Sequence, residues 1–368
     1  MTHLFEPLRI RDVTLINRIG VSPMCQYSAK DGIANDWHLV HLGSRAVGGA
    51  GLIVIEDTAV SPEGRISPGD LGIWSDAHLE PLSRITRFIS ANGVVPGIQL
   101  GHAGRKGSSS LPWKGGKPGS EGRHLELDEG GWEIIAPSPI PFGGDRPRTP
   151  QEITIAEIDK IKEAFRQGAR RAYEAGFKFL MLHASHGYIF QEFYSPITNH
   201  RQDMYGGSFE NRIRLLLEVV RLVRQEWSEN LPLSIRLSAQ DYIEGGWTLE
   251  ETIALSRQLK QEGVDLIDNM SFGANAPGAN VPFAPAFLVK DASIIKQSTD
   301  LLVAASAFSD PANGTKPEFI NEQITSGHLD LILLGREFLV SPYWVQQAAK
   351  VLGYTDEVSL PIQYAHWL

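Results

Sequence analysis

Cysteine is almost absent from the sequence: Cys25 stands alone among 368 residues. This count excludes an intramolecular disulfide framework, a zinc site of several cysteines and a cysteine-held iron–sulfur cluster. Basic residues are also few, 34 against 43 acidic ones, so the formal net charge is 34 − 43 = −9. This balance argues against nucleic acid or an anionic membrane as the main partner.

Long apolar runs are missing as well, since no segment approaches the roughly 18 apolar residues of a transmembrane helix. The first residues lack the basic and apolar regions of a signal peptide, so we expect a cytoplasmic protein without a membrane partner. Hydrophobic residues make up 42% and charged residues 21% of the chain, which indicates a globular protein. No internal repeat or linker divides it, and we expect a single domain over residues 1–368.

Eight short apolar runs recur along the chain. They are continuous rather than alternating, which is typical of strands buried on both faces of a parallel sheet. The runs cover residues 18–21, 52–55, 97–100, 177–183, 233–237, 265–270, 301–304 and 331–334. Helical periodicity fills several of the intervals, clearest at residues 155–175, 209–227 and 249–262, which follow the candidate N-caps Thr154, Ser208 and Thr248.

This alternation predicts an α/β fold of the (β/α)₈ barrel type. An open doubly wound sheet is the alternative. It loses support because no G-x-G-x-x-G follows the first strand and no G-x-x-x-x-G-K-[ST] occurs. The Gly- and Pro-rich stretch 107–147 predicts a long loop after the third strand, which would cover or frame the site.

Functional side chains of a barrel lie just beyond the C-terminal ends of its strands. Polar and cationic residues do follow the predicted strands at these points: Ser22 to Tyr27 after the first, Gln99, His102, Arg105 and Lys106 at the third, His183, His186 and Tyr188 at the fourth, Arg236 in the fifth and Arg336 after the eighth. We therefore expect them to converge on one pocket.

The pair His183 and His186 has three readings. As metal ligands they lack a third ligand at a recognisable zinc spacing, so no metal is expected. They could instead be a core histidine and a turn residue. In the functional reading their N–H groups bind one oxyanion and Tyr188 supplies a proton, which suits an activated C=C–C=O substrate.

Arg236 and Arg336 leave two alternatives open. An arginine in an apolar strand needs a fixed partner, either a structural carboxylate or the phosphate of a cofactor. Cys25 is either a small buried hydrophobe or a cofactor contact. The aromatic C-terminus at residues 364–368 is either frayed or docked onto something.

The motifs combine into a resemblance. The relevant pieces are Phe5-Glu6-Pro7, Asn17-Arg18, Ser22 to Tyr27, Gly64-Arg65-Ile66, Gly72 to Asp76, Gln99 to Lys106, His183 to Tyr188, Arg201 to Ser208, Glu210-Asn211-Arg212, Gly335-Arg336-Glu337 and Tyr364 to Trp367. Together they resemble the old yellow enzyme family of FMN-dependent ene-reductases, in its thermophilic-like and xenobiotic reductase A-like branch. The likeness runs essentially end to end, and the family forms a single (β/α)₈ barrel.

This resemblance implies a role for each matching position. Non-covalent FMN would be lined by Ser22, Pro23, Met24, Cys25 and Ala59, bound at its pyrimidine edge by Gln99 and Arg236, and held at its phosphate by Ser306, Ala307, Gly335 and Arg336. His183 and His186, assisted by Tyr27, would bind the carbonyl or nitro oxygen of the substrate. Tyr188 would protonate the α-carbon while flavin N5 delivers hydride to the β-carbon. NADPH, in preference to NADH, would reduce the flavin in the same pocket, with ping-pong kinetics.

Three segments depart from the family pattern. The strand-seven loop, Ala304 to Ala307, carries no glycine, which puts close approach to the phosphate in doubt. Asn269 to Phe272 replaces a Ser-rich stretch. The tail ends in His366-Trp367 rather than in an arginine. The resemblance also implies a homo-oligomer, a dimer or dimer of dimers, in which Trp367 reaches the active site of the neighbouring subunit.

Competing functions are a Schiff-base lyase and a flavin-binding sensor or silent barrel. A lyase would need a lysine at the end of a strand, and no predicted strand ends in one. The combination of His183, His186 and Tyr188 argues against a silent barrel, because such a protein needs no proton donor.

Overall fold

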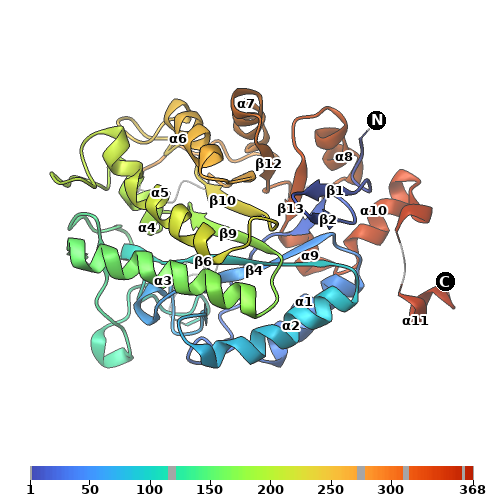
Figure 1. Ribbon diagram of the computed structural model, residues 1–368, viewed down its shortest axis with the longest axis horizontal. Coiled ribbons are helices and arrows are strands. Elements are labelled where there is room, and N and C mark those ends of the chain that lie inside the picture. Colours follow the sequence, from blue (N-terminus) through green and yellow to red (C-terminus); the bar gives the residue numbers. More distant parts are fainter. Residues whose placement is uncertain (1, 115–121, 272–277, 310–314, 359–360, 368) are drawn as a thin grey trace.

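The computed structural model describes residues 2–114, 122–271, 278–309, 315–358 and 361–367 (Figure 1). Residues 115–121 of the predicted long loop, Phe272 and Leu368 lie outside these ranges.

Eight parallel strands form a closed barrel, as predicted from the sequence. β13 pairs with β3 and β3 pairs with β4, so the sheet has no open end between them. The strands follow one another around the barrel as β3 (Ile19–Val21), β4 (Leu52–Ala59), β6 (Val95–Gly101), β9 (Phe179–Ala184), β10 (Leu233–Leu237), β11 (Leu266–Asn269), β12 (Leu302–Ala305) and β13 (Leu331–Leu334).

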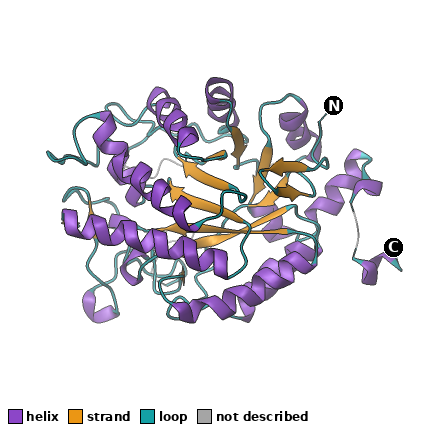
Figure 2. Ribbon diagram, viewed as in Figure 1, coloured by secondary structure: helices purple, strands orange, loops and turns teal. Residues whose placement is uncertain are grey.

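Helices surround these strands (Figure 2). One long helix follows each barrel strand: α1 (Asp36–Val47), α2 (Leu79–Ala91), α3 (Ile155–Glu174), α5 (Phe209–Glu226), α6 (Leu249–Gln261), α7 (Val289–Thr299), α8 (Pro317–Thr325) and α10 (Trp344–Leu352). Three short helices, α4 (Ile189–Tyr194), α9 (Arg336–Val340) and α11 (Ile362–Ala365), lie between or after them.

The predicted helix starts are confirmed by their caps. Thr154 accepts a hydrogen bond from the backbone N–H of Glu157 and Thr248 from that of Glu251, and both form complete capping boxes. Ser208 accepts one from Asn211. The corresponding helices end within one residue of the predicted bounds.

The second predicted strand is wrong in its length. The sequence prediction ends it at residue 55, because the next residues are polar, but β4 continues to Ala59 through an irregularity between Ile55 and Asp57. Glu56, Asp57 and Thr58 are buried there. Polar side chains are therefore accommodated inside this barrel, so a polar residue in the sequence does not by itself mark the end of a strand.

Shorter strands complete the sheet structure. The antiparallel hairpin of β1 (Leu8–Ile10) and β2 (Val13–Leu15) precedes the barrel. β5 (Leu71–Gly72) extends the sheet beside β4. β7 (Ile135–Ala136) pairs with β8 (Gln151–Glu152) within the long connection between β6 and α3.

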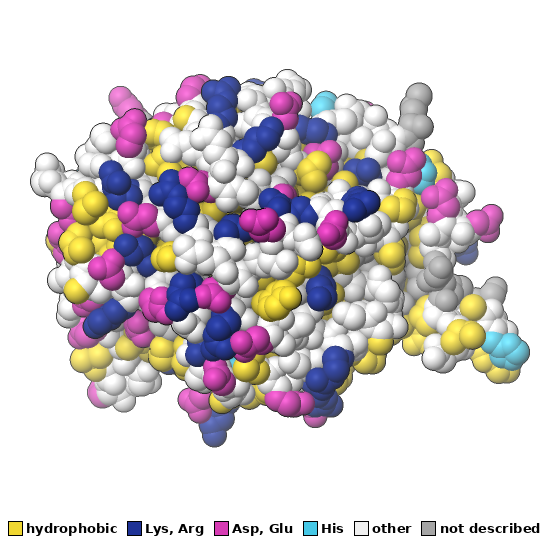
Figure 3. All heavy atoms as spheres, viewed as in Figure 1, with side chains coloured by type: hydrophobic (Ala, Val, Ile, Leu, Met, Phe, Trp, Pro, Cys, Tyr) yellow, Lys and Arg dark blue, Asp and Glu magenta, His cyan; other side chains and the backbone are white. Residues whose placement is uncertain are grey.

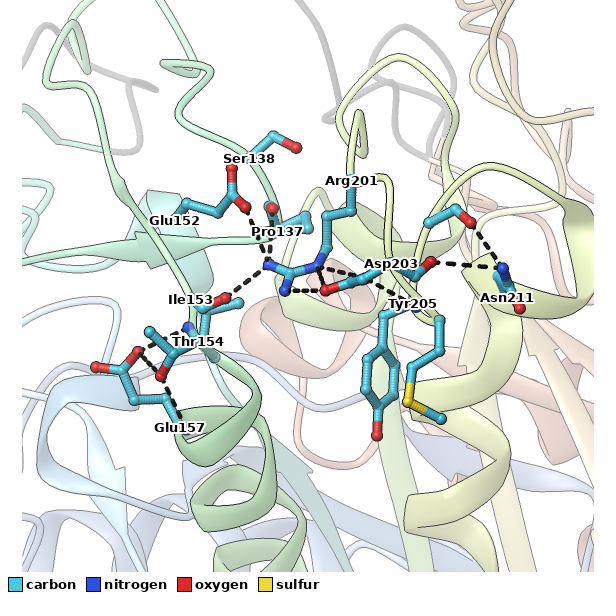
Figure 4. Close-up of polar contacts among 12 residues, drawn as sticks. Pro137, Ser138, Glu152, Ile153, Thr154, Glu157, Arg201, Asp203, Tyr205 and Asn211 are labelled. Atoms are coloured by element: carbon cyan, nitrogen blue, oxygen red, sulfur yellow. Dashed lines mark hydrogen bonds and ion pairs between the residues drawn. The ribbon is translucent and has the colours of Figure 1, made fainter.

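Arg201 ties this long connection to the barrel (Figure 4). Its Nη1 donates to the backbone oxygens of Pro137, at 3.1 Å, and Ile153, at 2.6 Å, while Nη2 pairs with Asp203 at 2.6 Å. Asn211, in the first turn of α5, donates to Gly206 O at 3.0 Å. The Arg-Gln-Asp-Met-Tyr-Gly-Gly-Ser motif thus anchors segments that frame the end of the barrel.

His102 fixes the turn that follows β6. Its ring Nδ1 accepts the backbone N–H of Gly104 at 3.1 Å, and its carbonyl accepts the N–H of Ile189, in α4, at 3.1 Å. Burial lowers the pKa of His102 to about 4. The imidazole is therefore neutral in the folded protein at pH values where it is charged in the unfolded chain.

We predict that His102→Asn lessens the acid sensitivity of folding, because the Asn oxygen can still accept the Gly104 N–H but does not titrate. In the unfolded chain the pKa of His102 is about 6.5, so its ring takes up a proton below that pH. In the folded protein the pKa is about 4, so the ring stays neutral down to that pH. Stability is therefore lost as the pH falls through this window, by about 3 kcal/mol at most. Urea unfolding at pH 7 and pH 4.5 measures the loss, and an equal loss in the variant would contradict this assignment.

Candidate active site

β9 and the turn after it bring three predicted site residues together. His183 Nε2 lies 3.2 Å from Nδ1 of His186, and the Tyr188 ring lies 4.8 Å from that of His183. His186 has a φ of 59°, in the left-handed region, and this turns the chain back so that its ring faces His183. The two rings are hydrogen-bonded to each other, so a substrate oxygen that takes both N–H groups must replace this bond.

The protonation of His183 follows from its surroundings. Burial, together with the positive charges of Arg236 and Lys106 and with His186, holds its pKa well below the usual value. The backbone N–H of Ser185 lies 3.3 Å from Nδ1, which makes this nitrogen the acceptor. The ring is therefore neutral with its proton on Nε2, the atom that faces His186.

Tyr188 lies in a small apolar cluster with Ile66 and Ala103, against which Cys25 and Tyr27 pack. Three predicted site residues from two strand ends thus meet here. Lys106, fully buried, places its Nζ 5.2 Å from the centre of the Tyr188 ring and donates to His186 O at 2.9 Å. The sequence places Lys106 among the residues expected to converge at this end of the barrel, but it does not predict the burial of its ammonium beside the phenol.

Arg236 lies inside the barrel. Its Nε donates to Oδ2 of Asp268 at 2.5 Å, and its Nη2 donates to Ser22 Oγ at 2.9 Å. The structural ion pair considered above is therefore present, and Ser22 joins it. Gln99, also buried, donates to Met181 Sδ at 3.2 Å. Because a thioether is a weak acceptor, the Gln99 amide retains capacity for a stronger partner.

A cavity of about 380 Å³ opens beside these residues, lined by Ser22, Pro23, Met24, His186, Met270, Ser306, Ala307, Ser309, Gly335, Arg336 and Glu337. It collects the predicted phosphate-binding positions from the ends of β12 and β13. Arg336 is exposed and has no ion pair or hydrogen bond within the described ranges. The buried hydroxyl of Ser306 likewise has no partner among the described residues.

The strand-seven loop lacks a glycine but contains a left-handed backbone position. Ala307 adopts a φ of 64°, the left-handed conformation that glycine would otherwise supply. Its carbonyl accepts the N–H of Ala286 at 2.9 Å, which holds this strained geometry in place. The loop therefore has the backbone shape of a glycine-bearing turn without the glycine.

Cys25 and Ala59 reach the same end of the barrel from β3 and β4. Burial raises the pKa of the Cys25 thiol well above its usual value, and the carboxyl groups of Asp70, Glu56 and Asp57 raise it further. The thiol is therefore neutral and is not a nucleophile. Ala59, the last residue of β4, is buried.

Trp367 does not line this cavity. Its side chain is 83% exposed and its ring contacts that of His366. The segment around α11 lies at the edge of the molecule, with apolar side chains on its surface (Figure 3), and Tyr364 Oη lies 3.4 Å from Oη of Tyr343.

Comparisons with known proteins identify the family. Residues 3–354 match the NADH:flavin oxidoreductase / NADH oxidase family. The chain is 44% identical over 365 residues to an NADPH dehydrogenase of Geobacillus sp. (strain WCH70), covering 99% of this chain and 98% of the relative. It is 41% identical over 363 residues to an NADPH dehydrogenase of Bacillus subtilis (strain 168), covering 98% of each.

Solved structures share the fold. The old yellow enzyme homologue of Zymomonas mobilis superposes with a TM-score of 0.78 at 25% identity, over 98% of this chain and all of that one. A 2-naphthoyl-CoA reductase gives a TM-score of 0.83 at 24% identity, over 96% of this chain but 53% of that longer one, and shows the fold alone. With its barrel, its His–His–Tyr cluster and these relatives, the chain belongs to the NADH:flavin oxidoreductase / NADH oxidase family.

Proposed function

We propose that the protein is an FMN-dependent ene-reductase that uses NADPH in preference to NADH to reduce the C=C bond of α,β-unsaturated carbonyl and nitro compounds. The observation that carries the proposal is the contact of the His183, His186 and Tyr188 rings beside the cavity. Relatives named NADPH dehydrogenase support the choice of reductant.

The residues present fit non-covalent FMN. Arg336 offers its guanidinium and Ser306 its hydroxyl to a phosphate, neither having a partner among the described residues, while Gln99 and Arg236 offer N–H groups to the pyrimidine edge. When bound, FMN supplies the hydride chemistry that no side chain can perform.

The remaining chemistry falls to the side chains. His183, which is neutral, and His186 donate N–H groups to the substrate oxygen, which draws electrons toward the carbonyl and activates the β-carbon. Tyr188 donates its phenolic proton to the α-carbon, and the buried Lys106 ammonium lies beside the phenol ring as it becomes more negative. Tyr27, packed in the same cluster, assists the two histidines in binding the substrate oxygen.

The first test is optical. The purified protein should be yellow, or become yellow with added FMN. NADPH should bleach it without oxygen, and 2-cyclohexenone should restore the colour. A protein that stays colourless with FMN would sink the proposal, whereas bleaching without recovery would favour the alternative of a flavin-binding sensor or a catalytically silent barrel.

We expect Tyr188→Phe to slow the oxidative half-reaction by about 10²-fold or more, the usual scale of a positioned proton donor, and to leave flavin reduction by NADPH nearly unchanged. Stopped-flow flavin absorbance separates the two half-reactions. Tyr205→Phe is the control, because Tyr205 is also buried but bonds Glu218 Oε2 at 2.8 Å, outside the pocket. Equal slowing of both half-reactions would show that Tyr188 is not the proton donor.

We further propose that the protein is a homo-oligomer, a dimer or dimer of dimers, whose tail reaches the pocket of a neighbouring subunit. The exposed Ile362 and Trp367 at the edge of the molecule support this. Deletion of residues 364–368 should raise KM for the enone and weaken association in sedimentation velocity. Kinetics and association that both match the full chain would refute the role of the tail.

A further inference from the structure

Asp57 is a buried acid in the C-terminal part of β4. It lies in the part of β4 beyond the irregularity, its residue is 3% exposed, and neither carboxyl oxygen has a hydrogen-bond partner among the described residues. The other buried acids of this region differ. Asp268 binds Arg236, Glu56 accepts the Gln26 N–H at 3.1 Å, and Asp70 accepts hydrogen bonds from Ile66 and Ser67.

Neighbouring residues make room for this carboxyl group. A Cβ on Gly101, the last residue of β6, would collide with Oδ1 of Asp57. The Asp57 carboxyl group therefore occupies the space that any side chain at position 101 would need. Because an unpartnered buried polar group costs free energy, such an arrangement indicates a missing partner rather than a packing role.

The surroundings of Asp57 indicate what the missing hydrogen-bond partner of its carboxyl group is. Asp57 pairs in register with Gln99, and in a parallel sheet such partners face the same side. Gln99 and Met181 contact each other on this side, and His183, two residues beyond Met181, faces it too. Cys25 hydrogen-bonds the backbone of Asp57, and Arg236 lies close enough to Asp57 to lower the pKa of its carboxyl group. Asp57 thus shares its surroundings with three predicted flavin contacts.

We propose that the carboxyl group of Asp57 is a further contact for the pyrimidine edge of the flavin, beside Gln99. The inference rests on the proposed function. That edge presents an imide, in which an N–H donor adjoins carbonyl acceptors. A neutral carboxyl group matches it because it has one O–H donor and one acceptor oxygen.

The electrostatics support a neutral carboxyl. Burial raises the pKa of Asp57 well above its usual value, Asp70 and Glu56 raise it further, and Arg236 lowers it. A neutral donor at this edge strengthens its hydrogen bond as the ring gains electrons, so Asp57 acts as a positioning residue that favours reduced flavin.

The experiment compares Asp57→Val with Asp57→Asn in the FMN-loaded protein. Val removes both hydrogen bonds at similar size, whereas Asn keeps a donor and an acceptor. We expect Val to lower the affinity for reduced FMN about tenfold more than that for oxidised FMN, which lowers the midpoint potential by about 30 mV. Asp57→Asn should change the midpoint potential by less than about half of that amount.

A second measurement uses the apoprotein. Because Val removes an unpartnered buried carboxyl, FMN-free Asp57→Val should melt at a higher temperature than the wild type. A carboxyl with a structural role would give the opposite result. Thr58→Val is the matched control: Thr58 is also buried in β4 but pairs with Leu100, on the side that faces α3, and should leave the potential unchanged.

The outcomes separate the two proposals. A wild-type protein that binds no FMN overturns the proposed function and this inference with it. A wild-type protein that binds FMN, with unchanged potential and affinity in Asp57→Val, overturns the role of Asp57 alone. If Asp57→Val does not fold, Asp57→Ala repeats the comparison, and an unchanged potential there is equally decisive.

Discussion

The register of parallel strands in a closed barrel determines which side chains meet at its C-terminal end. The backbone register of neighbouring strands places Asp57 beside Gln99, His183 beside Arg236, and Arg236 beside Asp268. Register partners face the same side of the sheet. A shift of one residue in any strand would turn its polar residue toward the surrounding helices. Closure between β13 and β3 then brings the phosphate-binding candidates to the same end, so the site is a consequence of register as much as of sequence.

Inside the barrel, burial disfavours the charged forms of several titratable side chains. It raises the pKa of Asp57, Asp268 and the Cys25 thiol, and it lowers that of His183. Arg236 and Lys106 are buried in the same region, and Arg236 forms an ion pair with Asp268. The region is therefore rich in hydrogen-bond donors. Such an environment suits a ligand whose own charge changes during the reaction, because fixed dipoles can stabilise the change without reorganising.

Much of this could be predicted from the sequence. The strands at residues 233–237 and 331–334 have the predicted bounds, since short apolar runs between helical segments leave few alternatives. The His–His–Tyr cluster followed from its place at a strand end. Three features could not be predicted. The continuation of β4 through Glu56 and Asp57 contradicts local polarity, the left-handed φ of Ala307 has no signature in an alanine, and the burial of Lys106 depends on a loop distant in sequence.

These exceptions share a physical cause. Each is locally unfavourable: a buried acid in a strand, a strained alanine, and a buried ammonium that offsets its burial with a carbonyl oxygen and aromatic ring faces. Local rules describe what an isolated segment prefers, whereas the contacts of the folded barrel hold these residues in place. The stability of the remaining core, from the strands and the apolar faces of their helices, tolerates the cost. Residues that violate local preference therefore mark the part of the barrel that is shaped for a ligand rather than for folding.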